Sequence, residues 1–277
     1  MMTVLAWQVE GDVARLDGAG FAATVCADRP GDGLAKIRLS GAAWPDARLL
    51  GVTSAGPTVK AGHSIERHAG GTDLALVGEE TPERPIRVDA IWRVTLGTAA
   101  DQFLLAVDQF VSVRTQRLDS HPDVYIESLV PCVAACRLVN AGRAEFEPLA
   151  PSSPPAAGGL SRFSSVPAGD AENGTVSFPQ SAAPGCLTFS LTQLPWTYVE
   201  MIHPADLRRD EWAWQPARPD GIASVRLRHH LFAVPSLEKG VILRARARGV
   251  FMPQGADPAA VARCYCAFAA ADPPLGS

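Results

Sequence analysis

Alternating apolar and polar residues recur in short stretches along most of this chain. The clearest stretch covers residues 102–114, in which one parity is nearly all apolar and the other is mixed. Successive side chains of a β-strand point to opposite faces, so this pattern predicts a long strand with one face in the core. Residues 224–232 and 241–251 repeat the pattern, with arginines or histidines between the apolar positions.

Shorter runs rich in valine, leucine and isoleucine lie between frequent glycines and prolines. The chain has 24 glycines and 23 prolines, and these residues commonly mark the turns between strands. The further runs that we predict as strands are residues 5–9, 22–27, 35–39, 74–77, 86–96, 125–130, 175–178, 186–192, 198–202 and 261–268.

Helix-start signals occur at two places, and each predicts a single turn. Pro204 can open a turn at residues 203–206, while Asp257 can cap a turn that has Pro258 at its first position. Strands and helices do not alternate in the βαβ order of a parallel sheet. The predicted fold class is therefore all-β: a large antiparallel β-sandwich with few short helices.

One stretch of low complexity interrupts this pattern at about residues 148–160, where proline, alanine, serine and glycine dominate. Strand-like sequence resumes after it, so we predict a surface loop or a crossover between sheets rather than a linker. All-β sandwiches often reach the length of this chain as one unit. We therefore expect residues 1–277 to form a single mainly-β domain.

The composition is that of a globular chain, with 47% apolar residues, 19% charged residues and a net charge of −4 at pH 7. This balance gives no electrostatic support for a nucleic-acid or membrane-surface partner. The apolar runs are too short to span a membrane, and the N-terminus lacks the features of a signal peptide. We expect a cytoplasmic protein, and its oligomeric state stays open.

The six cysteines do not show the spacing of a zinc site, so we expect buried free thiols and no metal. The chain also lacks the short motifs GxGxxG, GxxxxGK[ST], HExxH and GxSxG. Their absence weighs against a nicotinamide-dependent oxidoreductase, a P-loop NTPase, a zincin and an α/β-hydrolase. We predict no cofactor. A site assembled from distant strands would leave no such motif.

The first candidate catalytic residues are Glu200 and His203, at the end of the strand predicted at 198–202. Partial burial would raise the pKa of Glu200, which is what a general acid or base requires. The alternative is structural: Glu200 would pair with an arginine, and His203 would cap a turn.

A second group of candidates alternates along residues 224–232 and 241–251. If these two strands form a hairpin, their basic residues lie on one face and require an anionic counterpart, which can be a ligand. The alternative is a solvated face with ordinary ion pairs. The group comprises the catalytic candidates His230 and Glu238 and the binding candidates Arg226, Arg228, Arg244 and Arg246.

Two further groups are candidates for binding a substrate. Arg114, Asp119 and His121 follow the clearest strand directly, where a loop can hold binding groups on a rigid scaffold. Trp212 and Trp214 share one strand parity and can stack on sugar rings. A hydrogen-bonded turn is the alternative for the first group, and coverage of the core edge is the alternative for the tryptophans.

Four stretches together resemble the supersandwich of galactose-mutarotase-like proteins and of the β domains of polysaccharide lyases. They are RPIRVDAIWR at 84–93, DQFVSVRTQRLDSHP at 108–122, YVEMIHP at 198–204 and LEKGVILRAR at 237–246. The resemblance implies a concave sheet that faces a carbohydrate, and it adds Arg93 to the binding candidates. A mutarotase would offer a histidine pair and a late glutamate, for which His203 and Glu238 are the candidates here.

The leading hypothesis is a carbohydrate-recognising protein that binds a saccharide, an acidic one among the candidates, on a concave sheet face. One alternative is an enzyme on the same scaffold: a mutarotase-like sugar epimerase or a polysaccharide-lyase-like protein. In that case His203 or His230 would be the base, and Glu200 or Glu238 the acid. A second alternative is a structural or protein-interaction module whose arginine face meets a partner.

Overall fold

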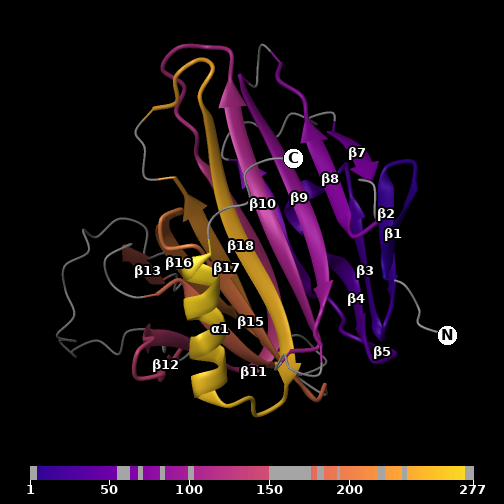
Figure 1. Cartoon of the computed structure of the whole chain (residues 1–277), viewed down its shortest axis with the longest axis vertical. Coiled ribbons are helices and arrows are strands. Elements are labelled where there is room, and N and C mark those ends of the chain that lie inside the picture. The colour runs from indigo at the N-terminus through magenta and orange to yellow at the C-terminus, as the bar shows by residue number, and fades with distance from the viewer. Residues whose placement is uncertain are drawn as a thin grey trace.

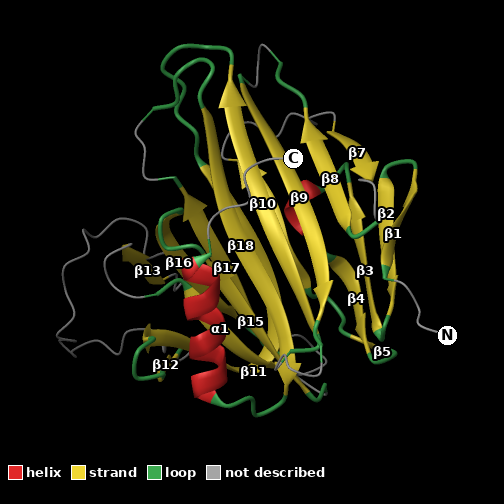
Figure 2. Ribbon diagram, in the orientation of Figure 1, coloured by secondary structure: helices red, strands yellow, loops and turns green. Residues whose placement is uncertain are grey.

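The computed structural model describes residues 5–54, 63–67, 71–81, 85–98, 103–149, 176–179, 184–191, 194–217, 222–232 and 236–271. These residues form an antiparallel β-sandwich with one α-helix and one short 3-10 helix, so the predicted all-β fold class is confirmed (Figures 1 and 2). Most of the proline-rich stretch at about 148–160 lies outside the described residues, because these end at Leu149 and resume at Val176.

One layer of the sandwich, which we call the major layer, contains most of the long strands. In spatial order it consists of the C-terminal part of β11 (Val124–Asn140), β14 (Cys186–Leu191), β15 (Trp196–Ile202), β18 (Ile242–Pro253), β10 (Leu105–Thr115), β9 (Ile86–Leu96), β8 (Asp73–Gly78) and β7 (His63–Arg67), with β12 (Glu145–Pro148) beside β11.

The opposite side of the sandwich has two parts. The part that we call the minor layer consists of β13 (Val176–Pro179), β16 (Leu207–Gln215), β17 (Ser224–Leu231), the N-terminal part of β11 and β6 (Arg48–Ser54). The N-terminal sheet consists of β1 (Ala6–Glu10), β2 (Val13–Gly18), β3 (Phe21–Cys26), β4 (Ala35–Leu39) and β5 (Ala42–Ala43), and the 3-10 helix η1 (Pro30–Asp32) lies between β3 and β4.

The 17-residue strand β11 belongs to both layers. Its first residues, as far as Pro131, pair with β17, and its later residues pair with β14 and β12. The inner faces bury one continuous hydrophobic cluster. The N-terminal sheet joins this core through Phe21, whose ring lies 5.4 Å from that of Phe251 on β18. Burial of this hydrophobic cluster is the main force that holds the layers together.

The predicted strand at 261–268 is wrong, because these residues lie within the helix α1 (Pro258–Ala270). Asp257 caps the helix through its side chain and Pro258 follows it, as predicted, but the helix runs for 13 residues rather than one turn. Val261, Tyr265 and Phe268 are buried at helical spacing against the outer face of the major layer. Both helical and strand periods fit this short sequence, and packing against the sheet selects the helix.

The C-terminal end of α1 is fixed by side chains of the major layer. Arg246 on β18 donates hydrogen bonds to the carbonyl oxygens of Phe268, at 3.0 Å, and Ala271, at 2.6 Å. His203 contacts the carbonyl oxygen of Ala269 through Nε2, at 3.0 Å. These contacts satisfy carbonyl groups that have no partner within the helix. No helix in the described part of the chain has the length and apolarity needed to cross a membrane.

The strands at 224–232 and 241–251 do not form the hairpin on which the shared basic face depended. β17 pairs with β16 and β11 in the minor layer, whereas β18 pairs with β10 and β15 in the major layer. The predicted turn at 203–206 is present as a hydrogen-bonded turn rather than a helix. The strands β2, β5, β6, β7, β12 and β16 were not predicted, and the predicted ends Gln102, Thr175 and Thr192 lie outside the described residues.

Replacing Arg246 with methionine tests the attachment of α1. The side chain is buried, so losing its charged hydrogen bonds should lower the free energy of unfolding by about 2 kcal/mol. Urea unfolding followed by circular dichroism measures this change. The matched control is Arg244→Met, because Arg244 is exposed on the same face of β18. Measured in chloride buffer, this variant should change the free energy of unfolding by less than about 0.5 kcal/mol. Equal effects of the two variants would contradict the role of Arg246.

Candidate functional site

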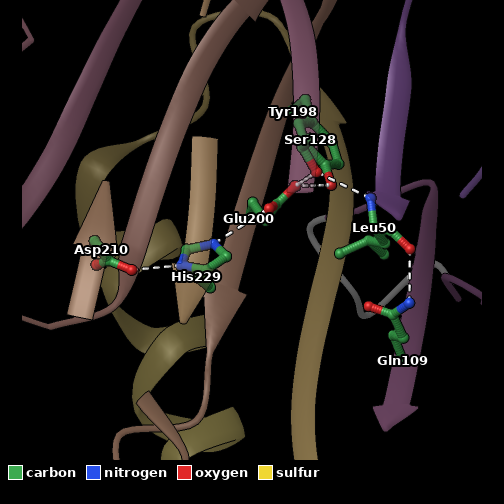
Figure 3. A network of polar contacts seen from close by, with 7 residues as sticks. All are labelled: Leu50, Gln109, Ser128, Tyr198, Glu200, Asp210 and His229. Atoms are coloured by element: carbon green, nitrogen blue, oxygen red, sulfur yellow. Dashed lines mark hydrogen bonds and ion pairs between the residues drawn. The ribbon is translucent and has the colours of Figure 1, made fainter. Parts of the chain in front are cut away.

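A chain of charged side chains crosses the interior between the two layers (Figure 3). His229 on β17 lies between Asp210 on β16, with Nδ1–Oδ1 at 2.5 Å, and Glu200 on β15, with Nε2–Oε1 at 3.2 Å. His229 and Glu200 have no exposed surface. Burial alone would lower the pKa of His229, but the two carboxylates outweigh it and raise this pKa to about 10. His229 is therefore protonated at neutral pH and bridges two carboxylates.

The same chain extends to the backbone of β6. The Glu200 carboxylate accepts hydrogen bonds from Ser128, at 2.7 Å, and from the hydroxyl of Tyr198, at 2.6 Å. Ser128 in turn accepts from the backbone N–H of Leu50, whose carbonyl oxygen accepts from Gln109. Leu50 has a φ of 55°, a strained value for leucine, and these bonds hold it there (Figure 3). The cluster joins the two layers and is closed to a ligand.

A second polar cluster lies on the outer face of the minor layer and is partly open to solvent. Cross-strand register places Glu127 opposite Arg228, and Arg228 opposite Glu211; Tyr125 lies opposite His230 in the neighbouring row. Directly paired residues in a sheet share a face, so these side chains come together from three strands. We call the following residues the outer polar cluster: Tyr125, Glu127, Glu211, Arg226, Arg228 and His230.

The two arginines of the outer polar cluster differ in how well they are paired. Glu127 accepts a short hydrogen bond from Nε of Arg228, whereas Nε of Arg226 lies 4.0 Å from the same carboxylate. Burial lowers the pKa of Arg228, but the hydrogen bond and charge of Glu127 outweigh it and raise this pKa. Arg226 is exposed and, among the residues that the structure describes, makes only the long contact, so most of its donors can reach a ligand.

His230 is enclosed by acidic groups rather than open to the groove. Its Nε2 lies 3.2 Å from Glu211, its Nδ1 lies 3.5 Å from Asp123, and its ring packs 5.3 Å from that of Tyr125. Both ring nitrogens are shielded from solvent. His230 therefore orients Glu211 more directly than it could contact a substrate.

A groove of about 530 Å³ lies beside the outer polar cluster, a size that suits a small ligand. Trp212 packs into the core, and Trp214 is half-buried with its Nε1 donating to the carbonyl oxygen of Leu149, so neither indole is an open platform. The residues that line the groove are Glu211, Trp212, Ala213, Trp214, Gln215, Pro216, Arg226 and Arg228.

The structure distributes the remaining candidates over other parts of the molecule. Arg93, Arg114, Arg244 and Arg246 lie on the outer face of the major layer. Asp119 and His121 are exposed on the β10–β11 connection, with Oδ1 of Asp119 3.9 Å from Nε2 of His121, and Glu238 is exposed between β17 and β18. His203 lies at the end of α1, and Glu200 lies in the interior. The four catalytic candidates are thus not gathered in one cleft.

Sequence reasoning missed the acidic half of the outer polar cluster. Tyr125 and Glu127 lie on a predicted strand, but no pattern in the neighbouring sequence indicates that this strand pairs with β17. The paired residues Glu127 and Arg228 are 101 positions apart in the chain. Glu211 lies on β16, where Arg209, Glu211 and Ala213 alternate with the buried Asp210 and Trp212. This alternation was the available signal for the missed strand.

Comparisons with known proteins support the fold. No family model and no curated protein matches the sequence. Among solved structures, a TPR-domain containing protein from Parabacteroides distasonis is similar, with a TM-score of 0.54 and 10% identity over 95% of this chain. The chain spans about half of that protein, 49% of its length.

Two other similar structures have lower scores. A galactose mutarotase-like protein from Lactobacillus casei has a TM-score of 0.49 and 9% identity, covering 86% of this chain and 99% of its own. A 4-alpha-glucanotransferase from Thermococcus litoralis has a TM-score of 0.45 and 9% identity, covering 91% of this chain and 40% of its own. The structural neighbours therefore include a galactose mutarotase-like protein, at low sequence identity.

The buried chain predicts how stability depends on pH. Because the pKa of His229 is raised from 6.5 to about 10, its contribution to stability is complete below pH 6.5 and is lost as the pH rises towards 10. The free energy of unfolding should fall by up to about 1 kcal/mol for each pH unit in this window. Urea titrations at pH 6, 7.5 and 9 measure it.

The control for this titration is His229→Gln, which removes the titrating group. Its stability should be lower than that of the wild type at pH 6, and the difference should shrink by pH 9. Two curves that stay parallel over the whole range would show that His229 is not protonated in the folded protein.

Proposed function

We propose that this protein binds an acidic saccharide in the groove on the outer face of the minor layer. The observation that carries the proposal is the unequal pairing of the two arginines that line the groove. Arg228 is committed to Glu127, whereas Arg226 offers unused donors beside the groove. Arginine binds carboxylates through two parallel hydrogen bonds, so a uronic acid carboxylate is a suitable partner for Arg226.

The other polar groups of the groove suit the hydroxyl groups of a sugar. Glu211 offers carboxylate oxygens, and Gln215 offers both a donor and an acceptor. Arg209 and His230 hold Glu211 in position, with Arg209 at 2.8 Å and His230 at 3.2 Å. A carboxylate that is already oriented loses less conformational freedom when it binds a ligand.

The proposal concerns binding and not catalysis. The nitrogens of His230 are shielded, and Glu200 is enclosed in the interior, so neither acid–base candidate near this layer faces the groove. His203 and Glu238 lie on other parts of the structure. Binding requires only the open polar groups of the groove, whereas an epimerase or a lyase would also require an acid and a base that face it.

Titration calorimetry with hexuronic acid oligosaccharides and their neutral counterparts tests this function. The wild type should prefer the acidic series, and the preference should weaken as salt screens the arginine. Arg226→Gln should weaken binding of the acidic series about tenfold, because a hydrogen bond between charged groups is lost. It should change binding of the neutral series little.

The matched control is Arg15→Gln, because Arg15 is an exposed arginine on the N-terminal sheet, away from the groove. This variant should bind both series like the wild type. Equal wild-type affinity for acidic and neutral sugars, or full acidic binding by Arg226→Gln, would overturn the proposal.

A further inference from the structure

The outer face of the major layer carries a second set of arginines, most of which are matched with carboxylates. Asp108 on β10 accepts two hydrogen bonds from Arg248 on β18, at 2.7 and 2.9 Å. Asp73 on β8 likewise accepts from both Nε and a terminal nitrogen of Arg93 on β9. Positive and negative groups thus alternate across four neighbouring strands, which is a favourable cross-strand arrangement.

Arg87 on β9 is matched in the same way, by Asp89 on its own strand. Both oxygens of Asp89 accept from Nε of Arg87, at 2.8 and 3.1 Å, and Oδ1 also accepts from the backbone N–H of Gly78. Among the described residues, Asp89 accepts no hydrogen bond from a second arginine.

Arg114 on β10 and Arg244 on β18 differ from these arginines, because neither is paired with a carboxylate of the described residues. Neither guanidinium group has a hydrogen bond or an ion pair with any residue of the described ranges, although both backbones pair in the sheet. Register places Arg114 directly opposite Arg87, and places Ser112 opposite both Arg244 and Asp89. Arg114 and Arg244 are therefore diagonal neighbours on one face, roughly 7–8 Å apart at their backbones, within reach of each other's long side chains.

This arrangement costs free energy in the absence of a ligand. Like charges opposite one another destabilise a sheet, and Arg114 has one such neighbour directly opposite and another on the diagonal. Asp89 neutralises only one of the three positive charges. Figure 1 shows that β10 and β18 extend beyond the C-terminal end of α1. Arg244 is exposed and Arg114 half-buried, so the pair is open to a ligand.

We propose that Arg114 and Arg244 form a binding site for a tetrahedral dianion, the phosphate or sulfate group of a small molecule. Two guanidinium groups carried on adjacent strands can each donate two hydrogen bonds to a group with this many oxygens. The hydroxyl of Ser112, which lies directly opposite Arg244 and two residues before Arg114 on β10, supplies a further donor. The charge of the dianion balances the two unmatched arginines. This site lies on the opposite side of the sandwich from the groove and is independent of it.

The experiment measures thermal unfolding in inorganic phosphate, inorganic sulfate and chloride, each at the same ionic strength and pH. The melting temperature of the wild type should rise with phosphate or sulfate concentration relative to chloride, since a ligand of the folded state stabilises it. Arg114→Gln and Arg244→Gln should each weaken the apparent affinity about tenfold. In chloride alone, Arg114→Gln should melt at or above the wild-type temperature, because it removes the repulsion from Arg87.

Arg226→Gln is the control, because it alters the groove and leaves this face intact. It should respond to phosphate and sulfate like the wild type. The proposal is overturned if the wild type shows no effect of either dianion beyond that of chloride, or if Arg114→Gln and Arg244→Gln retain the full effect. Loss of the effect in Arg226→Gln alone would also overturn it, by assigning the anion to the groove.

Discussion

The position of the two layers relative to each other depends on a buried polar interaction within their hydrophobic core, the contact of the His229 imidazolium with the carboxylates of Asp210 and Glu200. Two buried carboxylates and one buried cation are costly unless each is closely paired. The cation His229 is paired with a carboxylate at each ring nitrogen. Glu200 is paired further by hydrogen bonds from Ser128 and Tyr198. An apolar core can slide, but this chain of directed contacts has only one register, so it fixes how the layers face each other.

That fixed register determines what the outside of the minor layer presents. β16 and β17 carry a histidine–carboxylate pair on each face: Asp210 with His229 inside, and Glu211 with His230 outside. Neighbouring residues of a strand point in opposite directions, so placing the inner pair also places the outer one. The major layer differs, because α1 covers the apolar part of its outer face and leaves a charged part uncovered. The two sides therefore offer different chemistry.

The alternating pattern was sufficient to predict individual strands, and the bounds of β9 agree with those predicted at 86–96. It was insufficient for strand pairing, because pairing depends on contacts between distant segments, as between Glu127 and Arg228. The same limit applies to the site. Arg226 and Arg228 were recognisable from one strand, but Glu211 became part of the cluster only through the fold. The helix α1 was missed because packing on the sheet decides its conformation.

The sharing of β11 between the layers has a consequence for how the protein folds. During folding, its N-terminal part must pair with β17, and Asp108 on β10 must pair with Arg248, which is 140 residues away in the chain. Such distant contacts require large loops to close, and the entropy of loop closure is lost before the contacts stabilise the chain. This order of events makes folding slow. Until both halves of β11 are paired, its edges stay open to association with other chains. Expression at low temperature or with chaperones should therefore favour the native sandwich over aggregates.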